Sequence, residues 1–480
     1  MDGRLIVNPE YRNGRTPLNQ RIPLRIAAFL VACGGGLAAV RPAPVLSQAD
    51  EEFWRDQARR IVDSARLPKG GASGPWRNTT PYDLHVPGGN MGYPAFWVRD
   101  SVMMLGDDFI SAAELEGWIR LIVSGLKGPR DWTVRPGVVV PACSVPDHIN
   151  FDGLPIFYPG FYDREDKQGG PPWGKYPPLD DAYYFIRAVH DHWKMTGSLR
   201  LFNAALNMSF GRERLADLCE KIYRVPSSDP ATGIVTAGDV DTENAKDWGF
   251  SDAESKSGKL LFPSVLKFAA AVRLAELFDA DREPAKAKFY RDDAARLKAA
   301  IPATFFRAAA DGTEGWLHSA TGVGDQPDVW GSAFAVFCGA VDEPTARKVA
   351  AALTRAFREK TAVREGCVRQ IPTTDKLNGG GWQISIAKTG TYQNGGYWGT
   401  PTGWMIAAIA TVDPQAAADM ARDFVRFLRD HRRADGTAEA WEWFNPDTGE
   451  RNNPLYVATV ALPYLSLKEA GLLNERSRRP

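Results

Sequence analysis

The sequence has no excess of charge of either sign. Its 480 residues carry 58 basic and 58 acidic side chains, so the formal net charge is zero. Proteins that bind nucleic acid need clustered positive charge, because contacts to phosphate supply most of the affinity. No basic stripe occurs here, and nucleic acid is therefore not expected as a partner.

Cysteine and histidine are also scarce, with five and six residues. No two cysteines have the CxxC spacing of a zinc cluster, and the histidines are too scattered for a metal site. The GxSxG and HExxH motifs and the Walker loop are absent. The acidic run Asp239–Glu243 lacks the glycine and the final glutamate of an EF-hand, which leaves calcium a minor alternative. We expect no metal and no organic cofactor.

Long apolar runs are missing except near the N-terminus. Arg21 and Arg25 precede an apolar run at positions 26–40, which is short for a membrane span. Small residues at Ser47 and Ala49 suit cleavage by signal peptidase after Ala49. We therefore predict that residues 1–49 are an export segment and that the mature protein is periplasmic or extracellular.

A second interpretation of this segment is a lipid anchor. The stretch Leu30–Gly34 resembles a bacterial lipoprotein box, in which Cys33 would become lipidated. A buried first helix is a further alternative, but the three adjacent glycines Gly34–Gly36 make a poor helix interior. Membrane contact is expected only through such an anchor.

From residue 50 onward, apolar residues return every three to four positions, as in amphipathic helices. The periodic segments are 51–65, 100–126 (which could split in two), 180–196, 202–223, 263–280, 284–306, 330–338, 343–360, 403–412, 414–431 and 455–470. Strand-like alternation is scarce, with one short run at 137–141. No fixed repeat indicates a solenoid. About twelve helices suit six helical hairpins closed into a ring, so we predict one all-α domain at 50–480 with an (α/α)6 toroid.

The long loops between these helices are rich in tryptophan and carboxylates. They cover 70–98, 127–179, 233–262, 366–401 and 432–454, and loops of this length are usually functional. Flat aromatic faces can stack on sugar rings. Glycoside hydrolysis needs one protonated carboxyl and one ionised carboxylate, and aromatic neighbours help to keep the first protonated. The loops therefore predict a site for cleaving sugar linkages.

The first candidate segment leads into a helix. Arg99 and Asp100 could bind sugar hydroxyls, with Trp97 as a stacking face; a helix-start ion pair is the structural alternative. The run Phe96–Ser101 is similar to the "W-[LV]-R-D-S" stretch of exo-α-mannosidases that have an (α/α)6 barrel.

The second segment is Pro178–Ile186, followed by Thr196-Gly197. It resembles the "D-A-T-L-W-F-I … T-G-D" stretch in the α-1,6-glucosidase domain of glycogen-debranching enzymes, and the resemblance implies that Asp181 contacts sugar. Helix capping alone would explain either Asp180 or Asp181.

The third segment supplies a candidate general acid. A glycine-led turn, an acidic residue beside Trp248 and Gly258-Lys259 before a helix resemble the debranching pattern, and trehalases and processing α-glucosidases carry a similar aspartate as acid. Counted back from Gly258, Asp247 lies nearer that position than Asp252. In this chain Asp247 precedes the tryptophan, an order that departs from the family. Asp247 is the expected acid, Asp252 its alternative, and a solvated charge run the structural one.

The fourth segment, Tyr392–Trp404, resembles the "N-G-G-x-W-x-x-x-T-G-W" text of the same superfamily. The resemblance implies that Asn394, Trp398 and Trp404 contact sugar, and adjacent glycines allow close approach of the backbone to a ligand. Trp173 is a further expected stacking residue.

The fifth segment supplies a candidate general base. Residues 436–449 are similar to the "E-x-[YF]-N-P-x-T-G" region of processing α-glucosidases, whose glutamate is the base. Glu442 fits that spacing and has aromatic neighbours. Glu439 fits a shorter "G-x-x-E" form and is the alternative.

Together the five motifs imply the six-hairpin glycosidase superfamily. We expect Asp247 to protonate the leaving oxygen and Glu442 to activate water, with inversion, on an α-linked glucose- or mannose-type substrate. Polysaccharide lyases and sugar epimerases share this barrel but typically use tyrosine or histidine. The candidate site segments contain few histidines, which argues against these two classes. A non-catalytic sugar-binding protein would need the aromatics without the paired acids.

Overall fold

The computed structural model describes residues 43–474, apart from positions 75, 90–92, 159–167, 169–176 and 238–250. Residues Ala39–Pro480 make one compact unit, whose described part contains twelve α-helices. Within this part no helix has both the length and the apolar character needed to cross a membrane. Cys33 and most of the predicted export segment, together with Trp173 and Asp247, lie outside the described residues.

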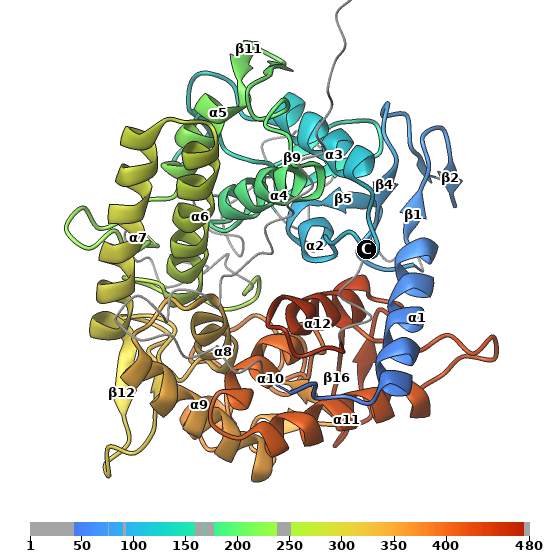
Figure 1. Ribbon diagram of the computed structural model, residues 1–480, viewed down its shortest axis with the longest axis vertical. Coiled ribbons are helices and arrows are strands. Elements are labelled where there is room, and N and C mark those ends of the chain that lie inside the picture. The colour runs from blue at the N-terminus through green and yellow to red at the C-terminus, as the bar shows by residue number, and fades with distance from the viewer. Residues whose placement is uncertain are drawn as a thin grey trace, which may run out of the picture. The chain divides into compact units, whose positions relative to one another are not determined.

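Six helices form a closed inner ring (Figure 1). In order round the ring α2 packs on α4, α4 on α6, α6 on α8, α8 on α10, α10 on α12, and α12 on α2 again. Several of them are buried on nearly all sides, as expected for helices surrounded by other helices. These helices are α2 (Val98–Met103), α4 (Asp181–Thr196), α6 (Leu261–Ala280), α8 (Val329–Cys338), α10 (Thr402–Ala410) and α12 (Val457–Glu469).

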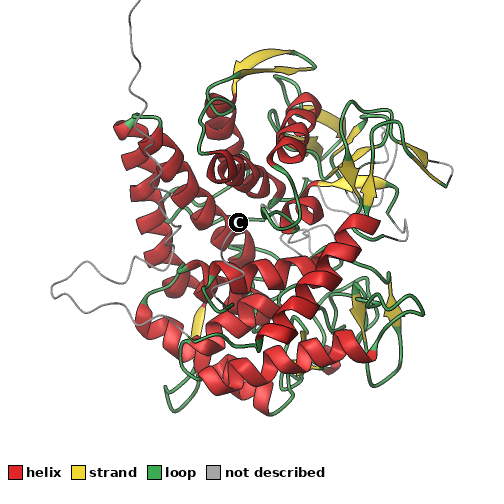
Figure 2. Ribbon diagram, turned by 45° about the vertical axis from the view of Figure 1, so that its right-hand side comes forward, coloured by secondary structure: helices red, strands yellow, loops and turns green. Residues whose placement is uncertain are grey.

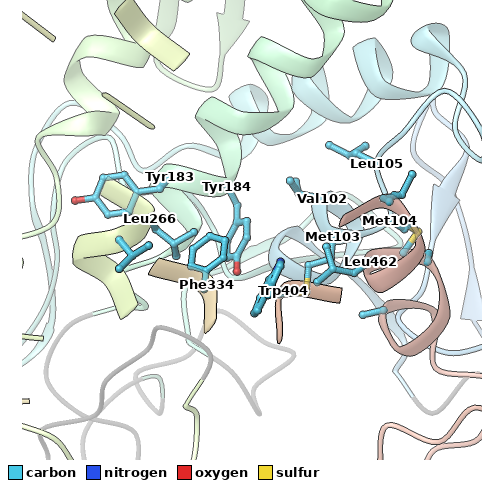
Figure 3. Close-up of a cluster of buried hydrophobic side chains, with 14 of the residues drawn as sticks. Val102, Met103, Met104, Leu105, Tyr183, Tyr184, Leu266, Phe334, Trp404 and Leu462 are labelled. Atoms are coloured by element: carbon cyan, nitrogen blue, oxygen red, sulfur yellow. The ribbon is translucent and has the colours of Figure 1, made fainter. Parts of the chain in front are cut away.

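The inner helices meet in a common apolar core. Every one of the six places buried side chains there, and Figure 3 labels members from each: Met103, Tyr184, Leu266, Phe334, Trp404 and Leu462. Burial of this kind is the main favourable contribution to folding. The core therefore fixes the helix ends from which the loops emerge.

The other six helices lie outside the ring. They pack in pairs with inner helices: α1 with α12, α3 and α5 with α4, α7 with α6, α9 with α8, and α11 with α10. These helices are α1 (Gln48–Ser64), α3 (Ala112–Gly125), α5 (Leu215–Tyr223), α7 (Pro284–Phe305), α9 (Glu343–Arg358) and α11 (Pro414–Asp430). The predicted (α/α)6 arrangement is confirmed.

Short antiparallel strands occupy the connections between helices (Figure 2). The three-stranded sheet β5 (Ala95–Trp97), β8 (His148–Asn150) and β9 (Pro155–Ile156) leads directly into α2. The two-stranded pairs are β1 (Arg66–Leu67) with β4 (Leu84–His85), β2 (Ala72–Ser73) with β3 (Trp76–Arg77), β6 (Trp132–Arg135) with β7 (Val138–Val140), β10 (Ala205–Met208) with β11 (Gly211–Arg214), β12 (Phe306–Ala308) with β13 (Gly315–Leu317), β14 (Val363–Arg364) with β15 (Cys367–Val368), and β16 (Trp443–Phe444) with β17 (Arg451–Asn452).

One predicted helix is wrong over its first half. The segment 202–223 was expected to be a continuous helix, but 205–214 is the β10–β11 hairpin and only α5 is helical. Its turn places Gly211 at φ 156°, a backbone conformation that L side chains rarely adopt. The apolar spacing around this glycine is therefore that of a hairpin, even though it mimics a helical period.

The folded domain begins before residue 50. Val45 and Leu46 are buried, and the Val45 N–H donates to the carbonyl oxygen of Leu472. The Ser47 side chain accepts from the Asp50 N–H and caps α1. Cleavage after Ala49 would remove all of these contacts, whereas cleavage further upstream would keep them. Where the chain is processed stays a prediction.

Helices α10 and α12 approach closely at a glycine. A Cβ atom on Gly403 would lie 2.5 Å from the carbonyl oxygen and 2.6 Å from Cα of Pro463. Because backbone atoms cannot move aside easily, Gly403→Ala should lower the free energy of unfolding by about 1–3 kcal/mol in denaturant titrations. Gly128→Ala is the control, since its new Cβ meets its nearest atom at 3.7 Å. Equal stability of the two variants would contradict this account of the packing.

Candidate active site

The predicted motifs gather at one end of the inner ring. Trp97 to Asp100 enter α2, Asp180 and Asp181 begin α4, and Asp252 precedes α6. The segment 392–398 precedes α10, and Glu442 precedes α12. The first two groups therefore lie at N-terminal ends of inner helices, where the helix dipole favours negative charge, and the others lie in the loops that lead to α6, α10 and α12.

Arg99 connects three of these segments. Its Nε donates to Asp180 Oδ2 at 2.7 Å, and one of its terminal nitrogens donates to Asp252 Oδ1 at 2.9 Å. The Arg99 side chain is 9% exposed, that of Asp180 is 0% and that of Asp252 is 18%. Of these two carboxyls, Asp252 is thus the one that reaches solvent.

Burial raises the pKa values of carboxyls that lie close to the Arg99 guanidinium. Burial raises the pKa of Asp180 to about 7, against the opposing effect of Arg99. Burial raises the pKa of Asp100 to about 6, although Tyr456 donates a hydrogen bond to Asp100 Oδ1. The site therefore retains protons up to neutral pH, because this many buried negative charges cannot coexist at low cost.

Asp181 is the most isolated of these groups. Its side chain is buried, and neither of its carboxyl oxygens has a hydrogen-bond partner. Burial, and then repulsion from Asp180, raise its pKa well above the ordinary value. A buried carboxyl without partners is costly, so Asp181 is a good candidate to bind an incoming hydroxyl group.

Glu442 is held by donors from two directions. The Tyr93 O–H donates to Oε1 at 2.7 Å, and Asn453 Nδ2 donates to Oε2 at 2.6 Å. Burial raises the pKa of Glu442 to about 7; these two hydrogen bonds lower it, and Asp100 and Asp252 raise it further. Near pH 7, the Glu442 carboxyl is therefore close to its pKa, and both its charged and its neutral form are populated.

Asp252 is fixed by a second set of contacts. Tyr392 donates its O–H to Asp252 Oδ2 at 3.1 Å, and the Asp252 N–H donates to Gln393 Oε1 at 2.6 Å. When ionised, Asp252 raises the pKa of Glu442 and of Tyr93. The structure thus brings Asp252 and Glu442, predicted from separate motifs, into one electrostatic environment.

Three of the four tryptophans expected to stack on sugar lie in the described residues, and all three are buried. The Trp97 ring stacks on His148 with centroids 4.5 Å apart. Trp398 donates its indole N–H to the Tyr392 carbonyl at 3.1 Å, and Trp404 lies in the apolar core beside Phe334 (Figure 3). In this structure Trp398 and Trp404 are packing residues that support the site.

Asn394 also has a supporting role. Its Oδ1 accepts from the Trp382 N–H at 2.7 Å, and its Nδ2 donates to the Ala387 carbonyl at 2.7 Å. The side chain is buried, so it holds the 382–394 loop together. Glu439, the alternative base, is half-buried; its N–H donates to the His431 carbonyl, and its carbonyl accepts from the Leu455 N–H.

The sequence analysis missed several residues at the site. Tyr93 and Tyr456 reach Glu442 and Asp100, and Asp147 bonds to His148 Nδ1 at 2.7 Å. Tyr93 lies 349 positions from Glu442 along the chain, so no local spacing connects them. The nearness of Tyr93 to the Trp97–Asp100 motif was the only available signal.

The described residues contain no group of three or more histidine, cysteine, aspartate or glutamate side chains placed to hold a metal ion. The segment Asp239–Glu243 lies outside them. Cys143, Cys219, Cys338 and Cys367 are free thiols.

No protein-family model matches the sequence, and no curated protein matches it. Solved structures match by fold. One is a glycosidase variant at 15% identity, where the match covers 89% of this chain and 100% of that chain with a TM-score of 0.50. Another is a metal-independent α-mannosidase from Streptococcus pneumoniae in complex with α-1,6-mannobiose, at 12% identity, 88% and 94% coverage and a TM-score of 0.51. A glucoamylase from Hormoconis resinae is 13% identical, with 90% and 76% coverage and a TM-score of 0.49. At these identities the similarity is one of fold, and this helical fold is shared with solved structures of glycosidases.

The raised pKa of Glu442 predicts a pH-dependent change in stability. Unfolded, Glu442 releases its proton near pH 4.5; folded, it does so near pH 7. Folding therefore takes up a proton between these values, and stability falls as pH rises through this window. Glutamine cannot ionise, so Glu442→Gln should gain about 3 kcal/mol of unfolding free energy relative to the parent between pH 4 and pH 8.

Thermal or denaturant unfolding of both proteins across that range measures this difference. The comparison at pH 4, where Glu442 is protonated in both states, serves as the internal control. A stability difference that stays constant with pH would contradict the environment described for Glu442.

Proposed function

We propose that the protein is a glycoside hydrolase in which Glu442 is the general base and Asp252 the general acid. The observation that carries the proposal is the Glu442 carboxyl, buried and held by the Tyr93 and Asn453 donors, in the electrostatic field of the more exposed Asp252. Two carboxyls in different environments are what acid–base cleavage of a glycosidic bond requires. The fold shared with solved glycosidases supports the same class of reaction.

The reaction would proceed in one displacement. Glu442 takes a proton from a water molecule while the oxygen of that water bonds to the anomeric carbon. The bond from that carbon to the leaving oxygen breaks, and the leaving oxygen receives a proton from Asp252. Attack from the face opposite the leaving group inverts the anomeric centre. A general base works best when its pKa lies near the working pH, as does that of Glu442.

Asp252 is preferred as the acid because of its position. A general acid must touch the leaving oxygen, and of the two carboxyls that Arg99 binds, the Asp252 side chain is 18% exposed and that of Asp180 is 0% exposed. Asp252 is partly exposed and lies at the rim of the carboxyl cluster around Arg99. Asp247, the first candidate from sequence, lies outside the described residues and is kept as the alternative.

The substrate class follows from the same contacts. Arg99, Asp100 and Asp181 offer charged donors and acceptors suited to the hydroxyl groups of a pyranose. One fold neighbour, an α-mannosidase, was solved in a non-productive substrate complex with α-1,6-mannobiose. We propose an α-linked mannose- or glucose-type substrate, with inversion. Assays of aryl α-mannosides and α-glucosides, with the product anomer identified by NMR at early times, test both points.

One observation favours the alternative that the protein is a polysaccharide lyase or a sugar epimerase. The argument against it depended on the shortage of histidine, yet His148 stacks on Trp97 beside the site, and Tyr93, Tyr392 and Tyr456 face the carboxyls. A lyase would release an unsaturated sugar that absorbs in the ultraviolet, and an epimerase would release no reducing end. Product analysis separates all three reactions.

Catalysis should depend on both carboxyls. Glu442→Gln and Asp252→Asn remove the proton acceptor and the proton donor, so each should lower kcat by at least about 10²-fold with the fold intact, as judged by circular dichroism. Steady-state rates on the best aryl glycoside provide the measurement.

Two matched variants complete this test. Glu439→Gln alters a half-buried carboxyl in the same loop as Glu442 and should keep a near-parental rate. Asp247→Asn should likewise keep most of the rate. If Asp247→Asn is inactive while Asp252→Asn is active, the acid is Asp247. Full activity of Glu442→Gln would remove the base from the proposal.

Activity should survive exhaustive treatment with EDTA. The proposed steps use only proton transfer between carboxyl groups, water and sugar, so no metal is required. Rates measured before and after chelation decide this. A complete loss that calcium restores would point to the Asp239–Glu243 segment.

A further inference from the structure

Two donors from distant parts of the chain meet at the Glu442 carboxyl. Tyr93 comes from the segment before β5, and Asn453 follows β17, the strand paired with the one after Glu442. They occupy one oxygen each, at 2.7 and 2.6 Å. Asn453 Nδ2 also donates to the Tyr93 oxygen at 3.2 Å, which leaves the tyrosine proton directed at Glu442. All three contacts are consistent with an ionised Glu442.

The neighbouring asparagine makes no equivalent contact. Asn452 Nδ2 lies 3.5 Å from the same Glu442 oxygen and its side chain is exposed. Hydrogen-bond strength falls steeply at such distances. Both asparagines thus approach Glu442 Oε2, Asn453 at the distance of a strong hydrogen bond and Asn452 at the distance of a weak one.

The backbone at position 453 fits this use. Its φ is 42°, in the left-handed region, which asparagine tolerates better than most residues other than glycine. The turn directs the amide back toward Glu442 while the Asn453 carbonyl accepts from the Glu442 N–H. Asparagine is therefore a residue that can supply both this backbone conformation and this side-chain donor.

We propose that Tyr93 and Asn453 are positioning residues that hold the Glu442 carboxylate in place and keep it able to accept a proton from water. This inference rests on the proposed function. Other groups close enough to act on Glu442 are Asp100 from α2 and Asp252 from the segment before α6, both negative when ionised; Tyr392 and Tyr456 lie in the same environment. The two donors oppose burial and both repulsions, because a hydrogen bond to the charged form favours that form.

The test is the pH profile of kcat in three variants. Asn453→Gly removes the amide and keeps the left-handed backbone unstrained, and Tyr93→Phe removes only the hydroxyl. Loss of either donor should move the acidic limb of the profile upward by roughly one pH unit, with a several-fold lower rate at pH 7 that recovers at higher pH. Asn452→Ala is the matched control and should leave the limb in place. A purely structural role would lower the rate equally at every pH.

A second readout does not need activity. In each background, the melting-temperature difference caused by Glu442→Gln grows with pH from near pH 4.5, and the pH at which it stops growing reports the titration of folded Glu442. This pH should move upward with Asn453→Gly and Tyr93→Phe and stay fixed with Asn452→Ala. If neither variant moves it, the inference is overturned. If both move it and no glycoside is hydrolysed, the donor assignment stands and the proposed function fails. Tyr93→Phe keeps the test valid should Asn453→Gly fold poorly.

Discussion

The contacts of Arg99 hold the site together. Its guanidinium bonds to carboxyls that lie 81 and 153 positions further along the chain, one at the start of α4 and one before α6. Without that positive charge, Asp180, Asp252 and Asp100 would repel one another in a region nearly closed to water, where charge interactions are strong. A buried ion pair contributes little net stability, but breaking one is costly because a charge is left uncompensated. The position of Arg99 at the start of α2 thus couples the geometry of the ring to the chemistry at its end.

Around this charge, the ring supplies rigidity and the loops supply polar groups. Trp398 and Trp404, which were expected to touch sugar, are buried in this structure, and the Trp398 indole donates to the loop carrying Tyr392; their contact with sugar stays a prediction. The polar groups at the site include carboxyls, tyrosine hydroxyls, the Arg99 guanidinium and the Asn453 amide. Hydrogen bonds from such groups discriminate between hydroxyl patterns more sharply than stacking does.

Most helices could be predicted from the sequence, because helical periodicity and proline in the first helical turn are local signals. Ten of the eleven periodic segments contain helices close to their expected limits, and 100–126 divides into α2 and α3. The 202–223 segment failed because a glycine with an unusual backbone angle decided its conformation. At the site, Arg99, Asp100, Asp181, Asp252 and Glu442 were all found by motif, but their pairings were not. Tyr93 with Glu442, or Arg99 with Asp252, depends on ring closure, and no spacing rule encodes that.

The two ends of the domain pack against each other beside the place where α12 meets α2 and closes the inner ring. α1 packs on α12, the Trp54 indole donates to the Val460 carbonyl 406 positions away, and Asn474 bonds to Glu51. Contacts of such long sequence separation form late in folding, because the loop-closure entropy must be overcome first. A chain that still lacks α12 (Val457–Glu469) lacks the main partner of α1 and the neighbour of α2 in the inner ring. The first helices made therefore wait for the last one before the ring can close.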